Sequence, residues 1–139
     1  MRIMIDTNVF LDVLTRREPF YAASRQVLEL CENGRVQGFL TASSVTDIYY
    51  LIHRHLHDTE QSYKALGAVL KIAKVLPVTN EDVLSAYLRR APDFEDCLLA
   101  ACAQVNHCDM IVTRNVKDFA GLGIPAMSPD EFLRNLMKP

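Results

Sequence analysis

The chain has little of what marks membrane, secreted or strongly basic proteins. No apolar run approaches the roughly 20 residues that a membrane helix needs, and a strand that starts almost at Met1 leaves no room for a signal peptide. We therefore expect a cytoplasmic protein without membrane contact. The formal charge is only −2, from 15 basic and 17 acidic residues, so there is no overall positive field of the kind that many nucleic-acid binders carry. Any nucleic-acid contact has to be local or metal-assisted.

The cysteines and histidines are not spaced as in common zinc sites. The four cysteines have no C-x-x-C spacing, and their mostly apolar neighbours favour small core residues over a disulfide or zinc site; they are Cys31, Cys97, Cys102 and Cys108. The cluster His53, His55 and His57 contains two histidines four residues apart that could share a helix face. Because no third ligand is placed by the sequence, we expect a surface or helix-end role for this cluster.

What is present indicates one α/β domain. A chain of 139 residues with 50% hydrophobic content is long enough for one well-buried domain, residues 1–139. Apolar runs predict strands at residues 2–5, 36–40, 74–78 and 109–113, with a brief extended piece at 124–127. Helical periodicity predicts helices in the intervals between these strands. The first ends at residue 14, the second spans 20–33, and the third starts from a cap within 41–44. The others span 59–74, 79–90 and 93–105, and a last helix begins at 129. This alternation predicts a largely parallel sheet covered on both faces.

The first strand ends on an acid. Residues 2–5 read as a buried strand, and they run without a break into Asp6, an acid that a core strand would not otherwise carry. In an open α/β sheet the carboxyl ends of the strands form the edge where ligands bind. We expect Thr7 or Asn8 to cap the following helix, so Asp6 would have no capping role, which favours a functional one.

Other acids should reach the same edge. Polar residues that open helices or follow the last strong strand are Asp47, Asp93, Asp96, Asn115 and Asp118. Crowded carboxylates repel one another unless a cation lies between them, and oxygen ligands suit Mg²⁺ or Mn²⁺ rather than zinc. Three of the acids have equally ordinary explanations, since Asp47 could stabilise a helix dipole, Asp93 could be an N-cap and Asp118 a turn residue.

A divalent ion held by carboxylates can activate water and stabilise charge on a phosphate oxygen, so the predicted reaction is phosphodiester hydrolysis. Two alternatives stay open. One is an aspartyl-phosphate phosphatase, which also begins with an aspartate at a strand end; it needs a second acid two residues later, where Asn8 stands. The other is a non-catalytic module that binds RNA or a protein.

Four motifs, in order along the chain, together resemble the PIN domain family. They are Ile5-Asp6-Thr7-Asn8-Val9, Thr46-Asp47-Ile48-Tyr49-Tyr50, Asp93-Phe94-Glu95-Asp96 and the stretch from Ile111 to Phe119. The resemblance extends from Met1 to the last helix. It implies a three-layer α/β/α sandwich with a mostly parallel central sheet, and a metal-dependent ribonuclease. Small bacterial members of the family are commonly toxins of toxin–antitoxin pairs, so the resemblance also implies a cognate antitoxin.

The resemblance assigns roles by position. Asp6, Asp47 and Asp96 match the metal-binding acids, and Asp93 matches an additional acid seen in part of the family. Thr113 matches a hydroxyl residue that supports the site.

This sequence departs from the family pattern at two of its positions. Asp47 is shorter than the glutamate that is frequent there, and Asn115 stands where many members have an acid. The lost negative charge should weaken metal binding, which keeps a weakly active or inactive module that binds RNA or an antitoxin as the alternative.

Basic residues near the predicted site could contact RNA phosphates despite the near-neutral total. They are Arg16, Arg17, Arg114 and Lys117. The apolar helices of so small a domain, together with the family resemblance, further predict a homodimer.

Overall fold

Strand β1 (Arg2–Ile5) lies at the centre of a five-stranded parallel sheet. In the computed structural model, which describes residues 1–138, β1 pairs with β2 (Gln37–Thr41) on one side and with β4 (Met110–Val112) on the other. The short strands β3 (Lys74–Leu76) and β5 (Ala126–Met127) close the two edges, so the order is β3-β2-β1-β4-β5. The predicted α/β fold with a parallel sheet is therefore confirmed.

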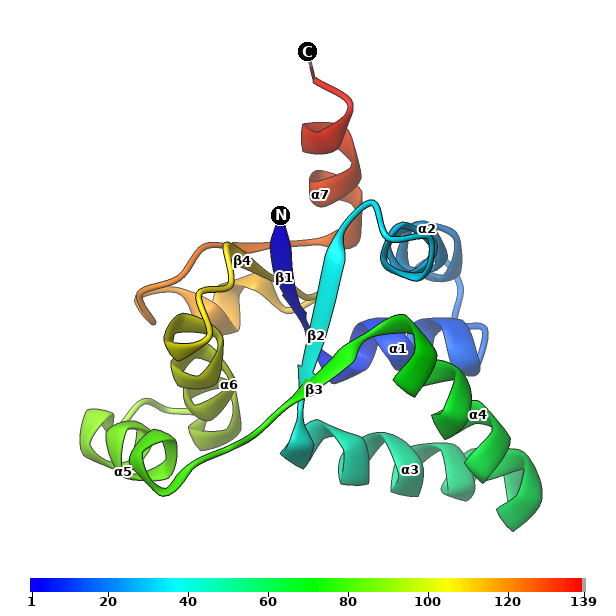
Figure 1. Ribbon diagram of the computed structural model, residues 1–139, viewed down its shortest axis with the longest axis horizontal. Helices are drawn as coiled ribbons and strands as arrows, with labels where there is room; N and C mark the ends of the chain where they lie inside the picture. Colours follow the sequence, from blue (N-terminus) through cyan, green and yellow to red (C-terminus); the bar gives the residue numbers. More distant parts are fainter. Residues whose placement is uncertain (139) are drawn as a thin grey trace.

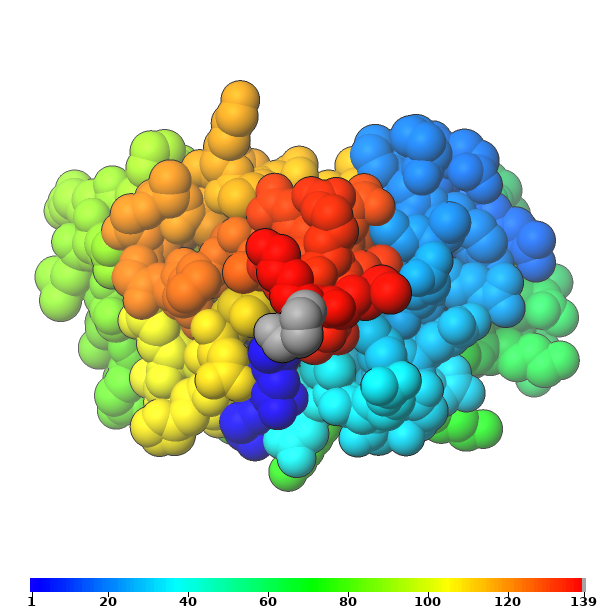
Figure 2. Space-filling view, turned by 90° about the horizontal axis from the view of Figure 1, so that it is seen from above, coloured from blue at the N-terminus to red at the C-terminus, as the bar shows by residue number. Residues whose placement is uncertain are grey.

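Helices cover both faces of the sheet (Figure 1). On one face lie α1 (Thr7–Leu14), α2 (Tyr21–Glu32), α3 (Ala42–Leu56) and α4 (Thr59–Ile72). On the other face lie α5 (Asn80–Arg89) and α6 (Phe94–Val105), and a single 3₁₀ turn, η1 (Val116–Phe119), follows β4. The last helix, α7 (Pro129–Leu136), packs against α2, as the space-filling view of Figure 2 also shows.

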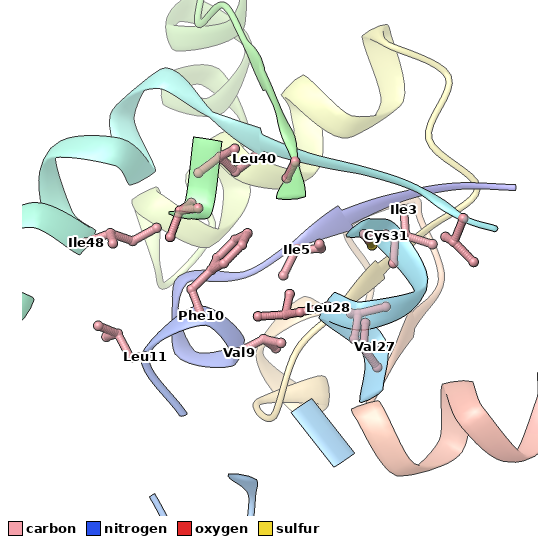
Figure 3. Packing of buried hydrophobic residues seen from close by; sticks show 14 of the residues in the cluster. Ile3, Ile5, Val9, Phe10, Leu11, Val27, Leu28, Cys31, Leu40 and Ile48 are labelled. Carbon is pink, nitrogen blue, oxygen red and sulfur yellow. The ribbon is translucent and has the colours of Figure 1, made fainter. Parts of the chain in front are cut away.

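Alternation along the central strand explains why two layers of helices are needed. Successive strand residues point to opposite faces, so Ile3 and Ile5 join one buried cluster while Met4 joins the other. Figure 3 shows the first cluster, in which Ile5 of β1 packs together with Val9 and Phe10 of α1 and Leu28 of α2. A strand that is apolar on both sides thereby fixes the three-layer arrangement and carries Asp6 to the sheet edge.

Most predicted helix starts are confirmed by their caps. The N-caps of α3, α4, α5, α6 and α7 are Thr41, Asp58, Thr79, Asp93 and Ser128. The sequence Ser128-Pro129-Asp130-Glu131 predicts a capping box, but only its first half forms, in which the Glu131 N–H donates to the Ser128 Oγ at 3.1 Å. The reciprocal capping box lies at Thr79 and Asp82.

Some predicted boundaries were wrong by one or two residues. The second strand begins and ends one residue later than predicted, and α4 ends at Ile72, because Lys74 already belongs to β3. Strand β3 stops before Pro77, which has no N–H to donate to a ladder, and β3 lies at the edge of the sheet, where a proline is tolerated.

The cysteines and the histidine cluster lie mostly as predicted, in the core and near a helix end. All four cysteines are free, and three are buried. His53 is half-buried beside the Ser62 hydroxyl at 3.2 Å, while His57 is the left-handed C-cap of α3. Among residues 1–138, no helix is both long and apolar enough to cross a bilayer.

Candidate functional site

Asp6 is fixed where β1 ends and α1 begins. Its N–H donates to the Val112 carbonyl oxygen at 3.0 Å, which continues the β1–β4 pairing, and its Oδ1 accepts the Thr7 N–H at 2.8 Å. Asp6 is itself the N-cap of α1, so the prediction that Thr7 or Asn8 caps this helix is wrong. Asp6 therefore has a capping role, and the case for its function rests on its surroundings.

A hydroxyl and an amide hold the second carboxylate oxygen. Thr113 follows β4, and its Oγ1 donates to Asp6 Oδ2 at 2.8 Å, while Asn8 Nδ2 lies 3.3 Å from the same oxygen. The Asn115 N–H donates to Thr113 Oγ1 at 3.0 Å, and the Arg114 N–H donates to Asn8 Oδ1 at 3.2 Å. These bonds join the loop after β4 to the start of α1 and orient Asp6. The amide of Asn8 also occupies the place where a phosphatase would need its general acid.

The first turn of α6 brings two more carboxylates to Asp6. Asp93 is the N-cap, its Oδ1 accepting the Asp96 N–H at 3.0 Å, so its structural role is confirmed. Asp6, Glu95 and Asp96 line one narrow pocket of about 10 Å³, roughly the space of a single water molecule or ion. The residues that complete this pocket are Thr41, Ser43, Ser44 and Leu99.

Asp47 approaches the cluster from α3. It is the sixth residue of that helix, beyond the first turn, so the suggested role as a partner of the helix dipole does not apply. Its side chain lies close enough to that of Glu95 to raise the pKa of the Glu95 carboxyl, and both side chains line one groove. Glu95 was missed by the sequence reasoning, although it stands directly before Asp96 in a motif already singled out.

Burial and neighbouring like charges together raise the pKa values of the acidic cluster. Partial burial raises the pKa of Asp6, despite the hydrogen bonds from Thr113 and Thr7, and the charges of Asp93 and Asp118 raise it further. Burial, followed by the charges of Asp93 and Asp6, raises the pKa of Asp96 to about 7. Each of these carboxylates therefore lacks sufficient positive charge nearby.

The pKa of Glu95 is raised to a similar value. The hydrogen bond with Asp47 is the largest cause that raises the pKa of Glu95 to about 7, followed by burial and the charge of Asp47 itself. The four acids from β1, α3 and α6 thus form one interacting group. Their individual roles stay predictions.

The donor set fits a hard divalent cation. Two ion pairs form within residues 1–138, Arg25–Glu29 and Arg114–Asp12, and neither neutralises the cluster. The available ligands are carboxylate and hydroxyl oxygens, which suit Mg²⁺ or Mn²⁺. In the same part of the chain, no three acidic, histidine or cysteine side chains are yet close enough to ligate one ion. The side chains would have to close around the ion, whose charge would offset their mutual repulsion.

The remaining predicted site residues differ in their placement. The Asn115 side chain is exposed at the start of η1, and Lys117 is exposed within η1. Arg16 and Arg17 are exposed just after α1. Arg114 is already engaged, because its Nε donates to the buried Asp12 Oδ2 at 2.8 Å and its guanidinium lies 4.1 Å from the centre of the Phe20 ring.

Comparison with known proteins agrees with this architecture. Residues 2–117 match the family described as PIN domain. No curated protein sequence matches the chain. Three solved structures are similar over most of the chain, each at low sequence identity.

The first is a toxin–antitoxin complex from Klebsiella pneumoniae, with 20% identity over 91% of this chain and 97% of that chain, and a TM-score of 0.68. The second is VapBC2 from Rickettsia felis bound to a DNA fragment from its promoter, with 17% identity, 92% and 98% coverage and a TM-score of 0.71. The third is VapC20 from Mycobacterium tuberculosis, a toxin that cleaves the sarcin–ricin loop, with 14% identity, 78% and 86% coverage and a TM-score of 0.62. At such identities these similarities establish the fold.

Proposed function

Because the chain belongs to the PIN domain family, we propose that it is a metal-dependent endoribonuclease whose reaction takes place at the carboxylates beside the end of β1. The observation that supports this most is the shared pocket of Asp6, Glu95 and Asp96, in which burial and neighbouring acids raise all three pKa values. Such uncompensated charge favours a cation, and a cation in turn favours an anionic substrate such as an RNA phosphodiester.

Asp6, Asp96 and Asp47 are the residues that would hold Mg²⁺ or Mn²⁺, with Glu95 beside them. When bound, the ion would supply positive charge for a phosphate oxygen and lower the pKa of a bound water. The protein contributes orientation: the Thr113 hydroxyl and the Asn8 amide fix Asp6 Oδ2, and the Asp93 cap fixes the first turn of α6. The acidic lining by itself repels phosphate, so RNA cleavage should require the ion.

The test is cleavage of a mixed-sequence RNA with Mn²⁺ and with a chelator. We expect Asp96→Asn and Glu95→Gln to lower the rate at least about tenfold, as changes around metal ligands do. Asp109→Asn is the matched control, because Asp109 is exposed at the opposite end of β4 and its contact is with the Arg2 N–H at 2.8 Å. Cleavage that persists with chelator, or in Asp96→Asn, would exclude the proposed reaction.

We further propose that the protein is the toxin of a toxin–antitoxin pair. The supporting observation is that similar structures include toxin–antitoxin complexes, one of them bound to DNA. Induced expression should arrest bacterial growth, and coexpression of a cognate antitoxin should restore it. Growth arrest by Asp6→Asn would contradict a toxicity that depends on the acidic site.

A non-catalytic module is the second candidate, and Asn115 is the residue that favours it. An amide at this position leaves one charge fewer for the ion. Isothermal titration with Mn²⁺ separates the two cases, because a chain without a working site should give no binding heat.

The predicted homodimer also remains a proposal. Large apolar side chains on α5 are exposed, and they are Val83, Leu84, Tyr87 and Leu88. An exposed apolar group of this kind suits an interface between copies. Sedimentation at micromolar concentration should give a dimer, and Leu88→Glu should shift it toward monomer; a wild-type monomer would contradict the proposal.

A further inference from the structure

An open groove adjoins the acidic site. It has a volume of about 330 Å³, within the range of small-ligand pockets. Its lining residues are Thr7, Asp47, Tyr50, Leu51, Arg54 and Glu95. Glu95 borders both this groove and the narrow pocket that contains Asp6 and Asp96. A ligand that enters the groove is therefore next to the carboxylates.

One face of α3 forms a wall of this groove. Asp47, Tyr50, Leu51 and Arg54 recur at intervals of three and four residues, which places them on the same side of the helix. Along this face an acid is followed by an aromatic ring, an aliphatic side chain and a guanidinium. At 1.5 Å per residue, Arg54 lies about 10 Å from Asp47 along the helix axis. The positive charge of Arg54 is therefore separated from the acids along the groove.

The ring of Tyr50 is exposed to solvent and contacts a neighbouring aromatic ring. Its side chain is 64% exposed, and its ring meets that of Tyr49 edge-on, with centroids 5.5 Å apart. Tyr49 in turn packs on Tyr63 at 5.0 Å and lies parallel to the His53 ring at 5.9 Å. This edge-on contact holds the Tyr50 ring from one side and leaves ring surface exposed toward the groove.

Arg54 complements this ring. It is exposed, and within residues 1–138 its guanidinium takes part in no ion pair or side-chain hydrogen bond. Arg114, by contrast, is already bound to Asp12. Arg54 therefore has donors available for an anion, on the same wall as the exposed aromatic ring.

We propose that this groove binds an unpaired nucleotide of the RNA next to the bond that is cleaved, with its base stacked on Tyr50 and a phosphate bound by Arg54. The inference rests on the proposed ribonuclease function and assigns to it two RNA-contacting residues outside the acidic cluster, Tyr50 and Arg54. Paired bases in a duplex are stacked on their neighbours and cannot offer a free face to Tyr50, whereas unpaired bases can. The remaining nucleotides then extend past Glu95 toward Asp6 and Asp96.

The test is equilibrium binding of a fluorescent RNA in an Asp6→Asn background without added metal, measured by anisotropy. Tyr50→Ala should weaken binding of a single-stranded oligonucleotide about 5- to 140-fold, because a stacked base contributes about 1–3 kcal/mol and about 1.4 kcal/mol is tenfold. Tyr50→Phe should bind like its parent, since the ring is retained. Arg54→Ala should weaken binding and lower the salt slope by about 0.7, as expected for one phosphate contact on a single strand.

Matched controls separate this groove from general surface effects. Tyr63→Ala removes an equally exposed ring, at 61%, that contacts Tyr49 from α4 but does not line the groove. Arg25→Ala removes a surface charge on α2. Neither control should change the affinity by more than about twofold, since isolated surface charges contribute little.

The outcomes distinguish the two levels of the proposal. If Asp96 and metal are required for cleavage but Tyr50→Ala and Arg54→Ala bind single strands like their parent, the groove assignment is wrong and the ribonuclease stands. Equal weakening of duplex and single-strand binding would also overturn the assignment. If the wild type cleaves no RNA with Mn²⁺, the proposed function is wrong, while loss of single-strand binding in Tyr50→Ala would still support the groove.

Discussion

Two aspartates six residues apart, Asp6 and Asp12, lie in opposite electrostatic settings. Asp12, in the middle of α1, has no exposed surface, and its Oδ2 accepts hydrogen bonds from Arg114 Nε at 2.8 Å and from Ser24 Oγ at 3.0 Å. Asp6, at the N-cap of the same helix, lies near Asp93 and Asp118, and the ion pairs of residues 1–138 bring it no cation.

The difference separates a carboxylate that stabilises the fold from one that is a candidate for binding a ligand. A buried charge is costly unless it is paired and hydrogen-bonded. The chain provides that pairing for Asp12 through Arg114, but leaves Asp6 among like charges. One loop supplies both partners, because the Thr113 hydroxyl reaches Asp6 and the next side chain, Arg114, reaches Asp12. Asp12 therefore positions the loop, and Asp6 is the candidate for binding.

Neutralising Asp6 should have the largest effect on function. Asp6→Asn removes a proposed metal ligand and should lower the RNA cleavage rate by more than about 100-fold, since even changes that only orient such ligands cost about 10- to 100-fold. Stability without metal should be unchanged or higher, because a crowded charge is lost. Cleavage rates and thermal unfolding measure the two parts. If Asp6→Asn were strongly destabilised but fully active, Asp6 would serve the fold and not the reaction, and the proposed contrast with Asp12 would be wrong.

Neutralising Asp12 should have the largest effect on stability. Asp12→Ala leaves Arg114 half-buried without its partner, and removing one member of a buried pair costs about 3–5 kcal/mol. Since Arg114 is partly solvated, we expect about 3 kcal/mol in urea unfolding.

The matched control for Asp12→Ala is Glu29→Ala, which breaks the exposed Arg25–Glu29 pair and should cost under about 1 kcal/mol. Equal costs for the two changes would show that the Asp12–Arg114 pair is not what holds the loop after β4.

The sequence allowed the convergence of the acids to be predicted, and the reason is topological. Once strands and helices alternate in parallel order, the residues after β1 and β4 and at the start of α6 share one edge. Asp6, Thr113 and Asp96 could be placed there without knowing a single contact. Asp47 was placed correctly by its helix, although it lies farther along that helix than predicted.

The details that decide each residue's role depend on contacts that periodicity does not encode. The Asp12–Arg114 pair joins residues 102 positions apart, so Arg114 looked like a free surface cation. Asp6 was assigned no capping role because a side chain that ends a strand was not expected also to start a helix. Glu95 was overlooked because its partner, Asp47, comes from a different helix.

Acidity should change the stability of the metal-free protein through Glu95 and Asp96. Both pKa values are about 7 in the folded protein, against 4.5 and 3.8 for the unperturbed groups. The folded state therefore binds more protons, so their contribution is fully present below a pH of about 4 and is lost as the pH rises to about 7. Thermal unfolding should show this decline in stability as the pH rises. The titration of other carboxylates adds its own pH dependence to the same curve.

The variant Asp96→Asn isolates this contribution to the pH dependence. It should match the wild type most closely below a pH of about 3, where Asp96 is protonated in both states, and exceed it increasingly as the pH rises toward about 7. Mn²⁺ should raise the wild-type unfolding temperature most at the upper end of this range, because it supplies the missing positive charge. A difference between Asp96→Asn and wild type that does not change with pH would show that Asp96 is not crowded in the folded protein.

The smallest expected effect comes from restoring a charge at Asn115. Its backbone N–H donates to Thr113 Oγ1, which donates to Asp6, and η1 carries Asp118, whose charge already reaches Asp6 and Asp96. Asn115→Asp should tighten Mn²⁺ binding by about three- to tenfold, because affinity rises with the number of charged ligands. Gln37→Glu adds the same charge at the opposite sheet edge and should leave Mn²⁺ binding unchanged. Weaker binding in Asn115→Asp would mean that the cluster is already too negative, so that Asn115 preserves activity by limiting repulsion.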